Sequence, residues 1–131
     1  MEDSCDVTID SSSGHRQGSI RSPRYPRHYP PSTACSYRLV GNSTERVQLM
    51  FQTFDLYHPG KVAEKNCLDA DIVKVSTIID GGKAEIDAFC GSVANPKIQL
   101  MSTGPELLIE FLSFQNTNTG TGFQAEYRFL Q

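Results

Sequence analysis

Hydrophobic and polar residues alternate along three stretches of the chain, at 47–52, 107–112 and 123–130. A two-residue period gives a strand one apolar face and one polar face, which is typical of half-buried antiparallel strands. Shorter apolar runs predict further strands at 37–40, 72–75, 86–89 and 98–101. Since no stretch keeps the helical period of about 3.6 residues, the pattern predicts an all-β fold.

Residues that favour turns separate the predicted strands. Glycine, proline and asparagine cluster at 41–43, 58–60, 80–82, 95–96, 104–105 and 116–122. Short strands joined by frequent turns predict a sandwich of two sheets. The segment 22–31 contains four prolines and two tyrosines. Because proline donates no backbone hydrogen bond, we expect a rigid, extended surface loop in this segment.

The length of 131 residues fits one domain, which we expect to span 5–131 after a short leading tail at 1–4. Hydrophobic residues make up 38% of the chain and aromatic residues 9%, which excludes a compositionally disordered protein. No window approaches the roughly 18 apolar residues that a membrane-spanning helix needs. We therefore expect no direct insertion into a membrane.

The formal net charge of −3 is too small to indicate nucleic-acid binding. The charge is unevenly distributed, because acidic residues gather at 63–87 while the charged residues between 11 and 44 are all arginines. These arginines are Arg16, Arg21, Arg24, Arg27 and Arg38. Charged runs are usually solvated loops and strand edges. The first four arginines also leave binding of a sulfated glycan, such as heparin, as a second interpretation.

Four cysteines indicate the compartment. Cys5, Cys35, Cys67 and Cys90 are widely spaced and form no C-x-x-C pair, so a zinc site is disfavoured. An even number of such cysteines in a small domain predicts two disulfides and an extracellular protein, with three pairings open. The sequence Asn42-Ser43-Thr44 is an N-glycosylation motif in a polar turn. It predicts a glycoprotein with the glycan on Asn42.

Common catalytic motifs are missing. The sequence contains no nucleophile elbow, no zinc-protease motif and no phosphate-binding loop. The three histidines lie in predicted loops and show no triad arrangement. Disulfide formation by all four cysteines leaves no thiol nucleophile. We therefore predict that the domain is not an enzyme.

Several short motifs occur together in the order and spacing of the CUB family. They are Ser22-Pro23-Arg24-Tyr25-Pro26 followed by Tyr29-Pro30, then Phe89-Cys90-Gly91, then Gly122-Phe123-Gln124-Ala125-Glu126-Tyr127. The chain resembles a CUB domain from end to end. The resemblance implies a jelly-roll-like sandwich of two antiparallel sheets with the disulfides Cys5–Cys35 and Cys67–Cys90. It also implies a non-catalytic module of a secreted protein or receptor ectodomain that binds another extracellular protein.

Many CUB domains bind one calcium ion at an end of the sandwich, through a tyrosine, a glutamate and two aspartates. The resemblance assigns these positions here to Tyr29, Tyr57, Asp71 and Phe114. Calcium needs about six to eight oxygen ligands, several of them carboxylates, and two of the three carboxylates are replaced. We therefore predict a degenerate site, no cofactor and a calcium-independent domain. A calcium-dependent CUB domain is the alternative if Glu64, Asp69 or Asn116 rebuilds the site.

The partner surface is expected in loops at one end of the sandwich, because loops on a rigid scaffold carry binding specificity. The loop 57–66 is longer than is usual in the family and is the leading candidate. Its candidate contacts, with two from the proline-rich segment, are Tyr57, His58, Lys61, Glu64, Lys65, Arg24 and Arg27. Tyr57 is the expected aromatic anchor. An insertion without a binding role is the alternative.

Overall fold

The computed structural model describes residues 5–14, 16–59, 67, 69–93, 96, 98–114 and 120–131, so the tail at 1–4 lies outside it. The elements follow the chain as β1 (Val7–Asp10), η1 (Ser11–Ser13), β2 (Gln17–Arg21), β3 (Ala34–Val40), β4 (Arg46–Asp55), β5 (Ile72–Ile79), β6 (Gly82–Cys90), β7 (Ser92–Val93), β8 (Gln99–Met101), β9 (Glu106–Leu112) and β10 (Gly122–Leu130). Within these ranges, no helix has the length and apolar character that crossing a membrane requires.

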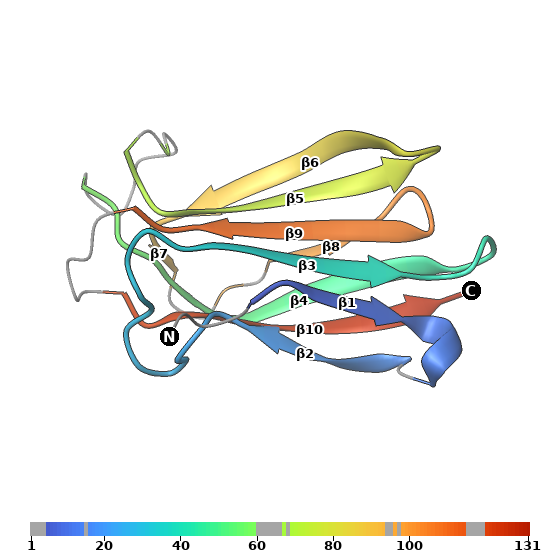
Figure 1. Cartoon of the computed structure of the whole chain (residues 1–131), viewed down its shortest axis with the longest axis horizontal. Helices are drawn as coiled ribbons and strands as arrows, with labels where there is room; N and C mark the ends of the chain where they lie inside the picture. The colour runs from blue at the N-terminus through green and yellow to red at the C-terminus, as the bar shows by residue number, and fades with distance from the viewer. Residues whose placement is uncertain are drawn as a thin grey trace.

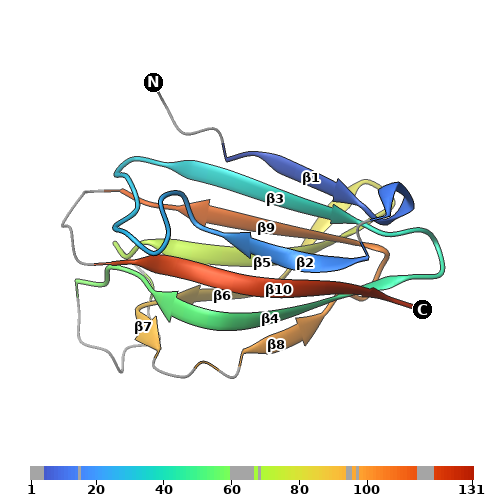
Figure 2. The ribbon, with the colours of Figure 1, turned by 90° about the horizontal axis from the view of Figure 1, so that it is seen from below.

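The strands form two facing sheets, as the alternating pattern predicts (Figure 1). One sheet has the strand order β1-β3-β9-β5-β6, and the other has the order β2-β10-β4-β7 with β8 also paired to β4. Figure 2 views the second sheet, with β10 between β2 and β4. The prediction of an all-β sandwich is therefore confirmed.

One strand pair departs from the antiparallel expectation. β1 pairs with β3 in parallel, with Val7 opposite Tyr37, whereas the other pairs are antiparallel. The chain leaves β1 through η1, crosses to β2 in the second sheet and returns through the proline-rich loop to β3. β1 and β3 consequently run in the same direction along one sheet edge.

Alternate residues of the three long patterned strands face the core. The buried hydrophobic residues of β4, β9 and β10 are Val47, Leu49, Phe51, Phe54, Leu107, Ile109, Phe111, Phe123, Ala125, Tyr127 and Phe129. Aromatic rings meet edge to face at the centre, with centroids 5.6 Å apart for Phe111 and Phe123. Each fully buried side chain of this size contributes about 1.5–3 kcal/mol to stability relative to an exposed one.

The alternating pattern did not identify β1 and β2. β1 alternates Val7 and Ile9 with Thr8 and Asp10, but it has only four residues and most of it is exposed, so its pattern is too short to stand out. In β2, the inward position before Ile20 is Gly18, and a Cβ there would lie 2.6 Å from the Tyr127 hydroxyl oxygen. The glycine makes room for a ring from β10 and breaks the apolar alternation of its own strand.

The two disulfides have the sequential pairing that the family resemblance implies. Cys5 pairs with Cys35 at a Cα–Cα distance of 5.0 Å, and Cys67 pairs with Cys90 at 5.8 Å. The first joins the segment before β1 to the start of β3, and the second joins the segment before β5 to the end of β6. Both lie at the same end of the sandwich, where the longer loops gather.

Candidate binding site at one end of the sandwich

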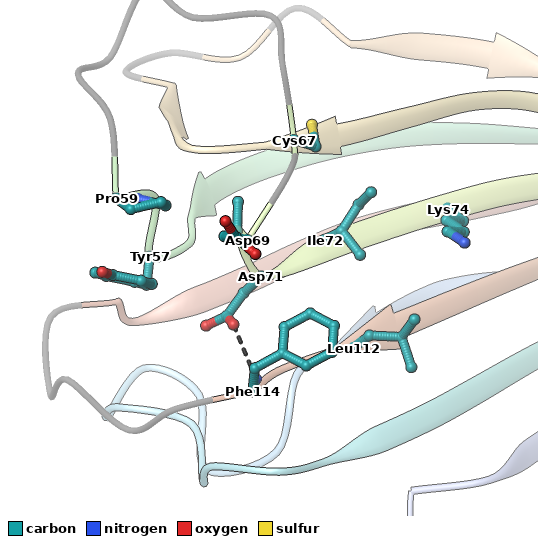
Figure 3. A pocket seen from close by; sticks show the side chains of 10 residues that line it. Tyr57, Pro59, Cys67, Asp69, Asp71, Ile72, Lys74, Leu112 and Phe114 are labelled. Atoms are coloured by element: carbon teal, nitrogen blue, oxygen red, sulfur yellow. Dashed lines mark hydrogen bonds between the residues drawn. The ribbon is translucent and has the colours of Figure 1, made fainter.

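The four positions assigned to the family's calcium site converge at this disulfide-bonded end. Tyr29 lies in the loop between β2 and β3, and Tyr57 comes two residues after β4. Asp71 directly precedes β5, and Phe114 comes two residues after β9. Because β5 and β9 are antiparallel neighbours, the start of β5 meets the end of β9. Figure 3 shows the resulting proximity of Asp71 and Phe114.

Hydrogen bonds join these four residues into one unit, which we call the Asp71 cluster. The Asp71 carboxylate accepts the Tyr29 hydroxyl on Oδ2 at 2.5 Å and the Phe114 N–H on Oδ1 at 2.9 Å. The Tyr57 N–H donates to the Tyr29 hydroxyl oxygen at 2.8 Å, and the Asp71 N–H donates to the Tyr57 carbonyl at 3.1 Å. Asp71 is only 1% exposed, so these bonds replace water around a buried charge.

Tyr29 supplies a neutral donor to this carboxylate. Its ring is buried and meets Phe111 edge to face, with the centroids 5.1 Å apart. Burial and, as the second cause, the hydrogen bond to Asp71 raise the pKa of the Tyr29 hydroxyl well above its ordinary value of 10.0. The hydroxyl therefore keeps its proton at physiological pH and donates it to Asp71.

The donors of the Asp71 cluster do not fit a calcium ion. Asp71 supplies the one carboxylate among the four positions, and both of its oxygens accept hydrogen bonds from within the cluster. Tyr57 offers a phenol, and Phe114 offers no ligand atom on its side chain. Asp69 lies nearby, but among residues of described placement no group of three or more His, Cys, Asp or Glu side chains could hold a metal ion.

An open pocket of about 540 Å³ adjoins the Asp71 cluster (Figure 3). Its lining residues are Tyr57, Pro59, Cys67, Asp69, Ala70, Asp71, Ile72, Lys74, Leu112 and Phe114. Ile72 and Leu112 lie opposite each other in the β5–β9 pair and are both partly exposed. Phe114 is 51% exposed. The pocket thus combines an apolar floor with Asp69 and Lys74, an arrangement suited to an apolar side chain of a partner.

The structure separates the predicted contact residues. Tyr57 lines the pocket, and His58 follows it as a half-buried residue. Arg24 instead lines a second pocket of about 310 Å³ together with Arg21, Tyr25 and Tyr37. The predicted contacts Lys61, Glu64 and Lys65 lie outside the described residues, as does Asn116, an alternative calcium ligand. Asp69, another alternative ligand, lines the pocket.

The arginines of the basic segment do not form one surface. Arg16 lies at the far end of β2 from the proline-rich loop and forms an ion pair with Glu45 at 2.8 Å. Arg38 forms an ion pair with Glu106 at 2.8 Å. Arg27 is exposed in the loop between β2 and β3. Of the four arginines assigned to a glycan surface, Arg16 therefore lies apart from the others, and glycan binding stays a prediction.

Sequence analysis did not select Ile72, Leu112 and Lys74 as site residues. A usable signal was nevertheless present for the two apolar residues. Leu112 occupies the outward-facing phase of β9, in which Glu106 and Glu110 are its charged neighbours. An apolar residue in the polar phase at the very end of a strand, on the same row as Ile72, is the pattern that would have indicated an exposed patch.

The CUB-domain family model matches residues 5–127, and the chain therefore belongs to the CUB family. CUB domains are generally non-catalytic modules of extracellular multidomain proteins. Membership of this family confirms the predicted resemblance and the extracellular location. Neuropilin-1 of Gallus gallus is 35% identical over 130 residues, covering 95% of this chain and 12% of that protein. Neuropilin and tolloid-like protein 2 of Homo sapiens is 31% identical over 126 residues, covering 96% and 22%.

Solved structures show the same architecture. The full extracellular region of zebrafish Gpr126/Adgrg6 aligns with a TM-score of 0.75 and 31% identity, covering 98% of this chain and 15% of that chain. The MASP-1 CUB2 domain bound to Ca²⁺ aligns with a TM-score of 0.73 and 29% identity, covering 95% and 98%. Among the curated relatives, the present chain spans between 11% and 24% of each protein's length.

Proposed function

We propose that this CUB domain binds another extracellular protein through the pocket beside the Asp71 cluster, and that it does so without calcium. One observation carries the proposal. Phe114 is a large apolar side chain that is 51% exposed at the rim of an open pocket, next to a buried carboxylate. Exposed apolar groups bordered by polar residues are typical of protein-binding surfaces.

Two aromatic residues serve as anchors in this proposal. Tyr57 and Phe114 both line the pocket, and aromatic residues are enriched among those whose truncation costs most binding energy. Ile72 and Leu112 form the apolar floor on which a partner side chain rests. The backbone of Tyr57 and Phe114 is held by the Asp71 cluster, so the anchors are positioned before the partner arrives and less ordering is needed on binding.

The proposed calcium independence is supported by the two hydrogen bonds that the Asp71 carboxylate accepts. Each Asp71 oxygen already accepts one hydrogen bond from within the cluster, so an ion there would compete with the Tyr29 hydroxyl and the Phe114 N–H for the same carboxylate. The replaced carboxylates supply nothing to offset that competition. The MASP-1 CUB2 domain binds Ca²⁺, so the proposal separates this chain from a structural neighbour of the same fold.

The binding surface is tested by comparing two exposed residues at opposite ends of the sandwich, Phe114 after β9 and Ile79 at the end of β5. Phe114 is 51% exposed beside the pocket, and Ile79 is 47% exposed at the far end of β5, roughly 26 Å away at about 3.3 Å per residue. A photo-crosslinking amino acid at position 114 is expected to capture an extracellular partner that the same group at position 79 does not. The affinity for that partner should fall at least about tenfold in Phe114→Ser and stay unchanged in Ile79→Ser. Equal losses in both variants would reject this surface.

Calcium dependence is tested by calorimetry on the wild-type domain and on Asp71→Ala. We expect no calcium affinity tighter than about 1 mM, the weak limit of extracellular calcium modules. Partner affinity should be the same in EDTA and in calcium. A tighter affinity that is lost in Asp71→Ala would show that the domain uses calcium.

Binding of a sulfated glycan is the second candidate, favoured by the pocket that Arg21 and Arg24 share with Tyr25 and Tyr37. Two cations in one concave site could hold a sulfate group. A heparin column distinguishes the candidates, because retention well above physiological salt that is lost in a double variant, Arg21→Ser with Arg24→Ser, would support the glycan. Elution near physiological salt would contradict it.

A further inference from the structure

The turn between β3 and β4 lies at the end of the sandwich opposite the pocket (Figures 1 and 2). Asn42, Ser43 and Thr44 form the N-glycosylation motif in this turn, and all three residues are exposed. The sequence contains no second motif of this kind. The structure adds the position of each polar atom of Asn42.

Within the described residues, the hydrogen bonds of Asn42 involve its backbone and its side-chain oxygen, but not its side-chain nitrogen Nδ2. The Asn42 backbone N–H donates to Glu45 Oε1 at 2.9 Å, and the Asn42 carbonyl accepts the Glu45 N–H at 3.0 Å. The side-chain oxygen Oδ1 accepts the Thr44 N–H at 3.0 Å and the Thr44 hydroxyl at 2.8 Å. Among the residues described, Nδ2 is therefore the polar atom of Asn42 left to solvent.

A buried carboxylate keeps the turn in this conformation. Glu45 is fully buried, and besides Asn42 it accepts the Ser11 hydroxyl on Oε1 at 2.5 Å and the Arg16 guanidinium on Oε2 at 2.8 Å. These contacts join the β3–β4 turn to η1 and to the segment before β2. We call Ser11, Arg16, Asn42 and Glu45 the Glu45 cluster. With its backbone held on this cluster, Asn42 presents Nδ2 outward in a defined direction.

We propose that Asn42 carries an N-linked glycan in the folded protein. In the transfer, Nδ2 loses one proton and forms a bond to the anomeric carbon of an oligosaccharide, while the lipid pyrophosphate that carried the sugar leaves. The donor is a lipid-pyrophosphate-linked oligosaccharide of the secretory pathway. Because no hydrogen bond of the turn uses Nδ2, the modified residue keeps every contact of the Glu45 cluster.

The position of the glycan has a consequence for binding. The Gly41 N–H donates to the Pro105 carbonyl at 2.8 Å, so the β8–β9 turn lies against the glycosylated turn. A branched oligosaccharide on Asn42 covers both turns and keeps a protein partner away from this end. The inference stands independently of the proposed pocket, because it depends on other residues at the other end of the sandwich.

The test uses the domain secreted from mammalian cells, followed by digestion with peptide N-glycosidase. The wild-type domain and Thr44→Ser, which preserves the motif and the hydroxyl, should both shift in mass and yield aspartate at position 42 after digestion. Asn42→Gln and Thr44→Val should be secreted without a shift. Wild-type protein secreted with unmodified Asn42, or a shift that persists in Asn42→Gln, would overturn the proposal.

A second measurement checks compatibility with the folded turn. Glycosylated wild-type domain and unglycosylated wild-type domain secreted into a bacterial periplasm should unfold within about 2 °C of each other, since the glycan replaces no hydrogen bond of the turn. A substantially lower unfolding temperature for the glycosylated form would show that the sugar disturbs the Glu45 cluster and would contradict the geometry on which the proposal depends.

Discussion

The two ends of the sandwich each contain a buried carboxylate, but they surround it differently. Glu45 is 0% exposed and pairs with the guanidinium of Arg16 as well as with neutral donors. Asp71 is 1% exposed, and its described partners are the neutral donors of Tyr29 and Phe114, which are 42 and 43 residues away. Glu45 is therefore held by a charged partner and by neutral donors, whereas the described partners of Asp71 are neutral donors only.

Loop length explains where the disulfides lie. Short turns close the end that contains Glu45, whereas the longer connections from β2 to β3, from β4 to β5 and from β9 to β10 leave and enter their strands at the end that contains Asp71. Long loops cost more closure entropy than short turns, and both disulfides lie at the long-loop end. The comparison teaches that non-covalent bonds alone close the short-turn end, whereas the end with the pocket is also held by two disulfides.

Removing the Cys67–Cys90 disulfide should lower the stability of the domain more than any other change that separates its two ends. The double variant Cys67→Ser with Cys90→Ser is expected to lose about 2–5 kcal/mol of unfolding free energy, because the bond closes a loop with a sequence separation of 23. Urea unfolding measures the loss. The Glu45 end should keep its amide protection in hydrogen exchange below the unfolding midpoint, and equal loosening of both ends would contradict the division.

Asp71→Asn should have the next largest effect. The amide can accept one hydrogen bond, but its NH₂ group then faces either the Tyr29 hydroxyl or the Phe114 N–H, and a lost buried hydrogen bond costs about 1–3 kcal/mol. Urea unfolding in EDTA and in calcium should give the same loss relative to the wild type. A wild-type domain that is more stable in calcium than in EDTA would contradict the proposed role of the Asp71 cluster.

Lowering the pH should remove a smaller amount of stability, which the ionised Glu45 carboxylate contributes to its end of the sandwich. The hydrogen bonds from Ser11 and the Asn42 N–H lower the pKa of Glu45 below its ordinary value of 4.5. A carboxylate with a lowered folded-state pKa stabilises the fold above about 4.5, and this contribution is lost as the pH falls through the folded-state pKa. Thermal unfolding of Glu45→Gln between pH 7 and pH 3 should therefore show a flatter acid limb than the wild type.

Asp10 provides the control for that titration. Its pKa is also lowered, chiefly by the Ser12 side-chain hydrogen bond, but it lies on the exposed N-cap of η1. We expect Asp10→Asn to retain most of the wild-type acid limb, because solvent screens an exposed carboxylate. If Asp10→Asn flattened the limb as much as Glu45→Gln, the effect could not be assigned to the buried cluster.

Phe114→Ser should have the smallest effect on stability. The Asp71 cluster uses the backbone N–H of Phe114, while the side chain is half exposed, so the free energy of unfolding should change by no more than about 0.5 kcal/mol. Urea unfolding checks this expectation. A large destabilisation would assign the ring to the core and would remove the evidence that it is free to bind a partner.

Sequence patterns predicted those elements whose signal is local. In β9 and β10, alternate apolar residues keep one buried phase along the strand, whereas β4 keeps it from Val47 to Phe51 and changes phase at a bulge before the buried Phe54. β1 was not predicted because its alternation covers only four, mostly exposed residues at a sheet edge, and β2 was not predicted because Gly18 occupies the inward position beside the ring of Tyr127. The second exception depends on what the neighbouring strand supplies.

The amino-acid sequence by itself determined the all-β class, the extracellular family, the disulfide pairing through family resemblance, and the four positions that meet at one end. Tertiary structure alone decided that Tyr29 donates to Asp71, that Ile72 and Leu112 floor a pocket, and that Arg16 pairs with Glu45. The physical reason is distance along the chain. Alternation and turn chemistry act between near neighbours, whereas each of these contacts joins segments that are far apart in the sequence and meet through strand pairing or loop packing.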